Sequence, residues 1–228
     1  MCGRFEVLTY EEVAAVVAAV EGRAEKRQAT QAAQTAQTAQ AAQEAQGKPR
    51  AQARPGSSIL LFGHGDASDN LEIEEATWGF DPEWSSRPVF NTRVESMIEG
   101  SPMWRDATAN GRCVIPAASF YEPHATETVP SPRTGRPLKR PYQFAGPDGE
   151  PLLMAGVQAD GRCSVVTCEP NRWVAPIHNR MPLLLRFEEV GTWLSPEWPA
   201  LADRSAFQLH AAPEHLEAPP QPDQLSLF

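Results

Sequence analysis

The second residue of the chain is a cysteine, which directly follows the initiator methionine. Methionine aminopeptidase removes Met1 when the next residue is small, so we expect a mature chain that begins with a free 1,2-aminothiol. An α-amine has a pKa of about 8, so a useful fraction is neutral near pH 7 and can form a Schiff base with an aldehyde. The Cys2 thiol can then close a five-membered thiazolidine, because the closure is intramolecular. The alternative is an inert terminal thiol.

The other three cysteines carry no comparable signal. Cys113 and Cys163 lie in apolar, strand-like runs, and Cys168 follows the second of these runs. No two cysteines form a Cys-x-x-Cys pair, which argues against a zinc site. We interpret Cys113 and Cys163 as buried small hydrophobic residues and predict neither a metal nor a cofactor.

Composition excludes several classes of protein. The 228 residues are 41% hydrophobic and carry a net charge of −9, which argues against a disordered chain and against a histone-like nucleic-acid binder. No apolar run approaches the roughly 18 residues that a membrane span needs, and the N-terminus lacks the apolar segment of a secretory signal. We therefore expect a cytoplasmic protein with reduced cysteines.

The first predicted element is an amphipathic helix. Thr9 and Glu12 have the spacing of a capping box, apolar residues follow at helical spacing from Val13 to Val20, and Gly22 can end the helix. Residues 28–46 then contain only eight Ala, seven Gln, three Thr and one Glu, with Gln at every third position. A period of three builds no apolar stripe on a helix. We interpret residues 23–50 as an exposed insert of low complexity, frayed or disordered.

Residues 51–187 show short apolar runs broken by Pro and Gly. These runs predict strands at 59–62, 113–116, 142–144, 152–157 and 163–167, and a short helix is expected around 187–194. Proline occurs 22 times, about twice the usual share of roughly 5%, which indicates many turns. The predicted class is α+β, with a strongly curved, mainly antiparallel sheet and flanking helices.

Polar and aromatic residues that suit chemistry occur in four segments. His178 is part of the sequence Ile-His-Asn-Arg-Met-Pro, and Glu122 ends the sequence Phe-Tyr-Glu. None of the segments is a phosphate loop, a metal motif or a nucleophile elbow. The segments are residues 1–5; 78–84 with 90–95; 112–117 with 120–122; and 177–182.

Together, and in this order, the four segments resemble the SOS response-associated peptidase (SRAP) family of abasic-site processing proteins. The resemblance runs from Cys2 to about Leu194 and is interrupted by the Ala/Gln insert. It implies a barrel-like SRAP fold over residues 1–211 and a partner, single-stranded DNA with abasic sites. The ring-open sugar of such a site has an aldehyde at C1′, so Cys2 is expected to form a covalent thiazolidine crosslink there.

The resemblance also implies roles for further residues. Glu122 and His178 match the family's acid/base positions, His178 for opening the sugar ring and Glu122 for moving a proton near the α-amine. Asn91 resembles the amide that holds Cys2. Trp84 matches an aromatic residue that stacks on an unstacked base. Trp78 is instead expected in the core. The remaining expected DNA contacts are Arg4, Arg93, Thr167 and Arg180.

Three departures from the family pattern affect the expected DNA contacts. Gln52 stands where the family usually has Asn, Ser85 where a second aromatic is common, and Pro123 where Trp follows the site Glu. Residues 87–186 nevertheless contain 12 Lys or Arg against 9 Asp or Glu, a net charge of +3, so the rest of the chain carries −12. This division favours a groove for a short single strand in a nucleoid-associated protein.

The segment 212–228 is predicted to be a Pro-rich, acidic tail. It ends in Gln-Leu-Ser-Leu-Phe, which resembles the pentapeptide by which bacterial proteins bind the replication sliding clamp. Leu227 and Phe228 would fill an apolar cleft, with Leu225 in the same motif, while Gln224 hydrogen-bonds at the rim. The alternative is an apolar tail that packs on its own domain.

Two further classes of function stay open. Cys2 could serve a cysteine peptidase or N-terminal-nucleophile hydrolase, as the family's name implies, that acts on itself or on proteins. The chain could also be a non-catalytic, clamp-bound adaptor. If the chain crosslinks to abasic sites, a lyase side reaction is also expected, because a Schiff base at C1′ permits β-elimination of the 3′ phosphate.

Overall fold

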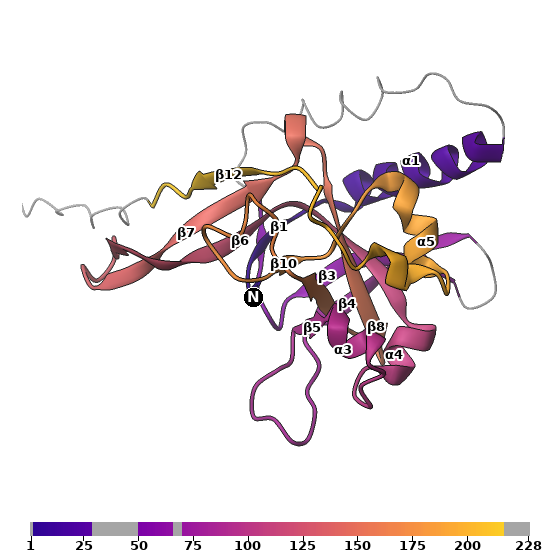
Figure 1. Ribbon diagram of the computed structural model, residues 1–228, viewed down its shortest axis with the longest axis horizontal. Helices are drawn as coiled ribbons and strands as arrows, with labels where there is room; N and C mark the ends of the chain where they lie inside the picture. The colour runs from indigo at the N-terminus through magenta and orange to yellow at the C-terminus, as the bar shows by residue number, and fades with distance from the viewer. Residues whose placement is uncertain (1, 29–49, 66–69, 217–228) are drawn as a thin grey trace, which may run out of the picture.

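The computed structural model describes residues 2–28, 50–65 and 70–216 (Figure 1). Most of the predicted Ala/Gln insert and the clamp-like motif, Gln224 to Phe228, lie outside the described residues. No helix within the described ranges is long and apolar enough to cross a membrane.

The described chain is dominated by one mixed sheet of 12 strands. The pairings β8–β9, β9–β4, β4–β3, β3–β6 and β6–β8 close into a ring, which gives the strong curvature visible in Figure 1. All pairings are antiparallel except β4–β9 and β5–β9. The strands are β1 Phe5–Val7, β2 Gln52–Ala53, β3 Ser58–His64, β4 Leu71–Trp78, β5 Asn91–Arg93, β6 Arg112–Pro130, β7 Pro137–Ala145, β8 Leu152–Ala159, β9 Arg162–Cys168, β10 Met181–Pro182, β11 Leu184–Leu185 and β12 His210–Pro213.

Helices are few and flank the sheet. Helix α1 packs on β3 and β4, α3 on β5 and β9, and α4 and α5 on β6. The helices are α1 Tyr10–Gln28, α3 Val94–Ile98, α4 Arg105–Asn110 and α5 Val190–Leu194, with short 3₁₀ turns at Pro147–Gly149, Phe187–Glu189 and Trp198–Leu201. The predicted α+β class and curved, mainly antiparallel sheet are confirmed.

The predicted helix has its expected start but not its expected end. The Thr9 amide donates to the Glu12 carboxylate at 2.8 Å, and the Glu12 amide donates to the Thr9 hydroxyl at 3.3 Å, which is the capping box. The four valines from Val13 to Val20 are buried. The helix continues past Gly22 to Gln28, because a glycine inside a helix costs only about 1 kcal/mol and good helix formers follow it.

Strand β6 connects the ring to the rest of the sheet. Its first residues, through Ala117, pair with β8, and from Ser119 onward it pairs with β7, while β1 pairs with Ala117, Ser119 and Phe120, where these two regions meet. Beyond Pro123 the β6–β7 pair continues as a hairpin arm. Strand β12 pairs with β7 and spans the predicted domain boundary after residue 211.

Candidate active site

Cys2 lies immediately before β1 and is fully buried. Its carbonyl accepts a hydrogen bond from the Asn91 side-chain amide at 2.8 Å, and its thiol contacts the Arg4 carbonyl at 3.7 Å. Asn91 opens β5, which pairs in parallel with β9, whereas the Arg4 carbonyl accepts the Tyr121 amide of β6. Two distant strands of the sheet, β5 and β6, therefore fix the position of Cys2.

Glu122 and His178 face each other beside this segment. Glu122 is fully buried in the middle of β6, and one of its carboxylate oxygens lies 3.7 Å from His178 Nε2. This distance exceeds that of a hydrogen bond, and the contact is an ion pair only when the imidazole is protonated and the carboxyl group is ionised. On the other side of the imidazole, His178 Nδ1 lies 3.2 Å from the Arg180 amide nitrogen and 3.0 Å from the Arg180 carbonyl oxygen. The imidazole is thus oriented by backbone and directed at the carboxyl group.

Burial changes the acidity of both groups. It raises the pKa of the Glu122 carboxyl from its ordinary value of 4.5 to about 7. It also lowers the pKa of His178, so that the neutral imidazole is favoured near neutral pH. Glu122 can therefore exchange a proton near pH 7, and His178 is held as the neutral imidazole, which can accept one, as acid/base catalysis requires.

The Cys2 thiol is held in its neutral form. Burial, followed by the negative charge of Glu122, raises its pKa well above the ordinary value. A thiolate is the nucleophile in cysteine peptidases, and such enzymes lower the thiol pKa. This environment instead suits a thiol that reacts second, after an amine has activated the carbon under attack.

Arg180 is placed between three segments of the chain. Its side chain is almost buried and makes two hydrogen bonds to Glu95, at 2.9 and 2.8 Å, and one each to Glu169 and the Thr167 carbonyl, both at 2.8 Å. Thr167 is itself fully buried, and its hydroxyl donates to the Thr92 carbonyl. These contacts anchor the segment that carries His178. Contact of Arg180 or Thr167 with DNA stays a prediction.

Arg4 is also engaged with the protein. Its guanidinium forms two hydrogen bonds with the Glu214 carboxylate, one at 2.8 Å, and lies 3.9 Å from the centre of the Tyr121 ring. A weaker bond of 3.3 Å joins it to Gln52. Glu214 directly follows β12 and was not expected from the sequence, because no motif marks it. The C-terminal part of the described chain therefore reaches the segment that carries Cys2.

Two expected DNA contacts are exposed. Trp84 is 72% exposed on the loop between β4 and β5, and Arg93 is exposed at the end of β5. Trp78 is fully buried, as expected, and its indole N–H donates to the Phe90 carbonyl at 2.8 Å. Asn91, which holds Cys2, directly follows Phe90. The buried Trp78 therefore helps to position the strand that carries Asn91 and Arg93.

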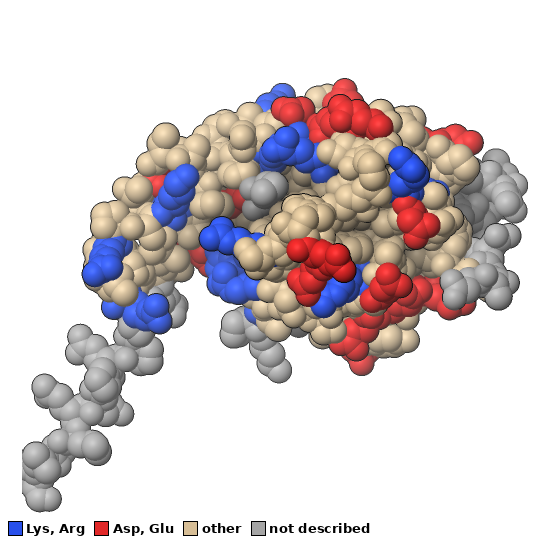
Figure 2. Space-filling model, turned by 90° about the horizontal axis from the view of Figure 1, so that it is seen from below, with Lys and Arg blue, Asp and Glu red and all other residues tan. Residues whose placement is uncertain are grey.

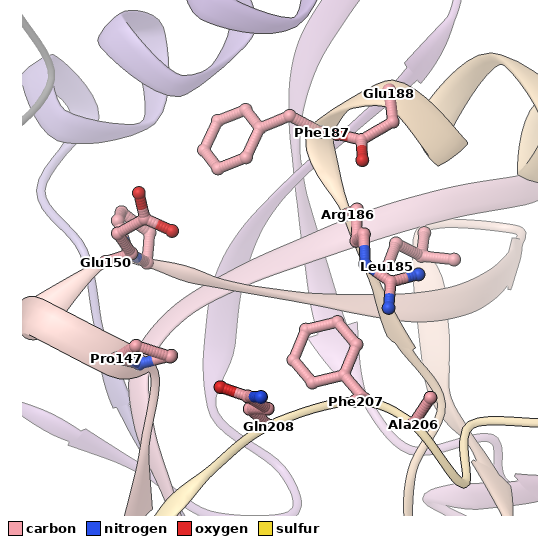
Figure 3. A pocket seen from close by; sticks show the side chains of 10 residues that line it. Pro147, Glu150, Leu185, Arg186, Phe187, Glu188, Ala206, Phe207 and Gln208 are labelled. Atoms are coloured by element: carbon pink, nitrogen blue, oxygen red, sulfur yellow. The ribbon is translucent and has the colours of Figure 1, made fainter. Parts of the chain in front are cut away.

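A surface pocket of about 370 Å³ lies elsewhere (Figure 3). It is lined in part by Glu150, Arg186, Phe187, Phe207 and Gln208, and none of its lining residues is a predicted site residue. Among the residues that the structure describes, no three His, Cys, Asp or Glu side chains group in a way that would hold a metal ion. All four cysteines are free and buried.

A family model described as "SOS response associated peptidase (SRAP)" matches residues 1–221. The abasic site processing protein YoqW of Bacillus subtilis is 30% identical over 167 residues, which are 65% of this chain and 68% of that protein. The abasic site processing protein YedK of Escherichia coli is 27% identical over 158 residues and 65% of each chain.

The fold is also found among solved structures. A phage-related protein of Bordetella bronchiseptica superposes with a TM-score of 0.63 at 21% identity, over 93% of this chain and 94% of that one. A protein of Bacteroides thetaiotaomicron gives a TM-score of 0.53 at 20% identity, over 72% and 77% of the two chains. These likenesses concern the fold.

Proposed function

The chain belongs to the SOS response-associated peptidase (SRAP) family, and from this premise we propose that it processes abasic sites in single-stranded DNA by crosslinking itself to them. The observation that carries the proposal is the position of Cys2. Its carbonyl accepts a hydrogen bond from Asn91, and the negative charge of Glu122, which faces His178, adds to the rise in the pKa of its thiol. The relatives named above as abasic site processing proteins support the substrate.

The proposed reaction needs only the groups of residue two after Met1 has been removed. The α-amine attacks the C1′ aldehyde to give a carbinolamine, which loses water to give an imine. The Cys2 sulfur then adds to the same carbon, and its proton moves to the nitrogen. Aldehyde and aminothiol thus give a thiazolidine and one water, with no oxidant or cofactor. Because both nucleophiles sit on one residue, the second closure is intramolecular and fast.

The neighbouring groups are proposed to move protons in this sequence. His178, as a neutral imidazole, accepts the proton of the C1′ hydroxyl when the sugar ring opens, and the resulting imidazolium passes it to the ring oxygen. Glu122, with its pKa of about 7, is matched to an α-amine of pKa about 8, so proton transfer between them is nearly balanced. Asn91, through its hydrogen bond to the Cys2 carbonyl, keeps Cys2 in position relative to His178 and Glu122.

A peptidase or hydrolase acting through the Cys2 thiol is the second candidate. It requires a thiolate, usually beside a histidine that accepts the thiol proton. Here burial raises the pKa of the thiol, and the thiol contacts the Arg4 carbonyl. These observations favour the aminothiol reaction. A lyase side activity is compatible with the same imine, because β-elimination competes with thiazolidine closure.

The proposal is tested with single-stranded DNA that carries one abasic site. Intact mass is measured first, since a retained Met1 would block the amine. Met1-free protein is then incubated with the DNA and run on a denaturing gel. A heat-stable DNA–protein band is expected. Absence of this band with Met1-free protein would overturn the proposal, and Cys2-dependent peptide turnover would favour the peptidase.

We also propose that the C-terminal motif binds the replication sliding clamp. A peptide of residues 219–228 is expected to bind purified clamp, and Phe228→Ala is expected to weaken binding at least about tenfold, since burying a phenyl ring contributes roughly 1.5–3 kcal/mol. Fluorescence anisotropy of the labelled peptide measures this. Equal affinity of both peptides, or no binding by either, would leave the adaptor role without support.

The Arg4–Glu214 contact predicts a restraint on DNA binding. If Arg4 contacts phosphate, Glu214 must release it, and a partly exposed ion pair is worth about 0.2–1 kcal/mol. Glu214→Gln should therefore tighten binding of single-stranded DNA up to about fivefold. Anisotropy titration measures the change. The control is Glu99→Gln, which removes an equal charge from an exposed position; an equal gain in this control would contradict the restraint.

A further inference from the structure

The hairpin arm of β6 and β7, residues 124–140, carries the excess positive charge of the central part of the chain. It contains Arg133, Arg136, Lys139 and Arg140 but only one acid, Glu127, so its net charge is +3. The whole of residues 87–186 also has a net charge of +3. Positive and negative residues elsewhere in that range therefore cancel, and the basic character belongs to the arm.

The positive groups of the arm are available to a partner. Arg133, Arg136 and Lys139 are exposed, and among the described residues none of them forms an ion pair. Arg140 is the exception, since its Nε lies 3.1 Å from Glu127. Figure 2 shows Lys and Arg side chains gathered at the end of the arm, whereas on the body of the molecule acidic side chains lie among further Lys and Arg. A local excess of positive charge of this kind is typical of a surface that binds a polyanion.

The base of the arm belongs to the candidate active site. Glu122 lies two residues before the arm on β6, opposite Tyr142 of β7. The Ala125 amide donates to the Ile177 carbonyl at 2.8 Å, next to His178. The positive charge of Lys139 is near enough to add to the lowering of the His178 pKa, behind the larger effect of burial. The row of positive groups therefore begins beside the acid/base pair and leads away from it.

The pairing of β6 with β7 shapes this row. Pro123 pairs with Pro141 and Thr128 pairs with Lys139, so residues 124–127 of β6 stand opposite Arg140 alone. Such a bulge bends a strand and increases its twist. The Thr126 and Glu127 amides both donate to His124 Nδ1, which holds the bulge in shape. The arm thus continues strand β6 of the ring and is bent by the bulge. Its surface is hollowed where it meets the body (Figure 2).

We propose that the arm binds backbone phosphates of the lesion-bearing strand on one side of the abasic site, with Arg133 and Arg136 as the outer contacts and Lys139 nearest the lesion. The inference rests on the proposed function, because it starts from an abasic sugar held at Cys2. It assigns to the arm a binding surface separate from the acid/base pair. Arginine suits such contacts because its planar, always-charged group donates several hydrogen bonds to phosphate.

The test compares two charge-matched double variants of the full chain. Arg133→Gln/Arg136→Gln changes the outer arm and leaves Lys139 and the acid/base pair intact. Arg105→Gln/Arg186→Gln removes two exposed charges elsewhere and is the control. Binding to undamaged single-stranded DNA is measured by anisotropy as a function of salt. The arm variant should bind more weakly and lower the log–log salt slope by about 1.4, since each single-strand phosphate contact contributes about 0.7.

Crosslinking then locates the contact. At saturating DNA the arm variant should crosslink at the wild-type rate, while the DNA concentration that gives half the maximal rate rises. Substrates with the lesion at the 5′ end or at the 3′ end should differ, with the defect confined to one of them. Equal salt slopes for the arm and control variants, or equal defects on both substrates, would overturn the arm as a one-sided phosphate contact. Absence of crosslinking by the wild-type chain would instead contradict the proposed function, and the anisotropy result would still decide the arm.

Discussion

Cys2→Ala is expected to abolish the heat-stable DNA–protein band while leaving a Schiff base that borohydride can trap. Alanine is small, so Met1 is still removed and the α-amine is kept, but the sulfur that closes the thiazolidine is lost. A plain imine hydrolyses, whereas the closed ring does not. The structure places the Cys2 backbone by its carbonyl bond to Asn91, which the substitution leaves in place.

Cys2→Ser sharpens this expectation. Serine also permits removal of Met1 and keeps the α-amine, but its hydroxyl gives at best a weaker oxazolidine. The band should therefore be lost on heating and appear with borohydride, as for alanine. A variant with an additional residue between Met1 and Cys2 gives the opposite test, because its thiol survives while the α-amine is moved. A heat-stable band from Cys2→Ala without reductant, or from the lengthened chain, would contradict the proposed chemistry.

The strands that are clearest in the sequence are those whose consecutive residues are all buried and therefore form unbroken apolar runs. Leu152 to Val157 and Cys163 to Cys168 are buried without a break, so β8 and β9 are visible as apolar runs. Strand β4 was missed because its outer face carries acids: Glu72 and Glu74 alternate with Leu71 and Ile73. Several strands of two to four residues, among them β5 and β12, were also not predicted, since they are defined by their partners in the sheet and carry little pattern of their own.

The candidate site shows a similar division. Residue positions came from resemblance to the family, and the structure brings Cys2, Asn91, Glu122 and His178 together although 176 positions separate the first from the last. The pairing of β1 with β6 and of β5 with β9 brings the first three together, and the Ala125–Ile177 hydrogen bond with the Arg180 contacts holds the segment that carries His178. Burial of Glu122 could not be foreseen from its motif. The contact of Glu214 with Arg4 was also missed, because it joins two segments that carry no shared pattern.

Glu122→Gln is expected to lower the rate of crosslink formation by about 10²–10⁴-fold near pH 7, the usual contribution of a positioned proton-transfer group. Glutamine keeps the shape of the side chain but cannot take a proton from the amine. The wild-type rate should change around pH 7, where Glu122 titrates, and the variant should lose this feature while keeping the rise that reflects the α-amine. Single-turnover crosslinking as a function of pH measures both profiles.

The same carboxyl group predicts a change in stability that does not depend on catalysis. Because burial raises the pKa of Glu122 from 4.5 to about 7, the folded chain holds a proton that the unfolded chain loses between these values. The stability that Glu122 contributes is full below about pH 4.5 and is lost as the pH rises through about 7. The loss amounts to about 3 kcal/mol by pH 8, at roughly 1.36 kcal/mol per pKa unit.

Thermal unfolding tests this expectation with matched variants. Glu122→Gln removes the titration, so its Tm relative to the wild type should rise between pH 5 and pH 8, by about 6–12 °C if a loss of ~3 kcal/mol is divided by about 2–4 °C per kcal/mol for a domain of this size. Glu99→Gln, an exposed carboxylate on the same chain, should show no such trend. If Glu122→Gln slows crosslinking but leaves the pH dependence of Tm unchanged, the buried carboxyl is not the group that titrates near pH 7. If it raises Tm at pH 8 without slowing crosslinking, Glu122 is a buried acid that takes no part in proton transfer.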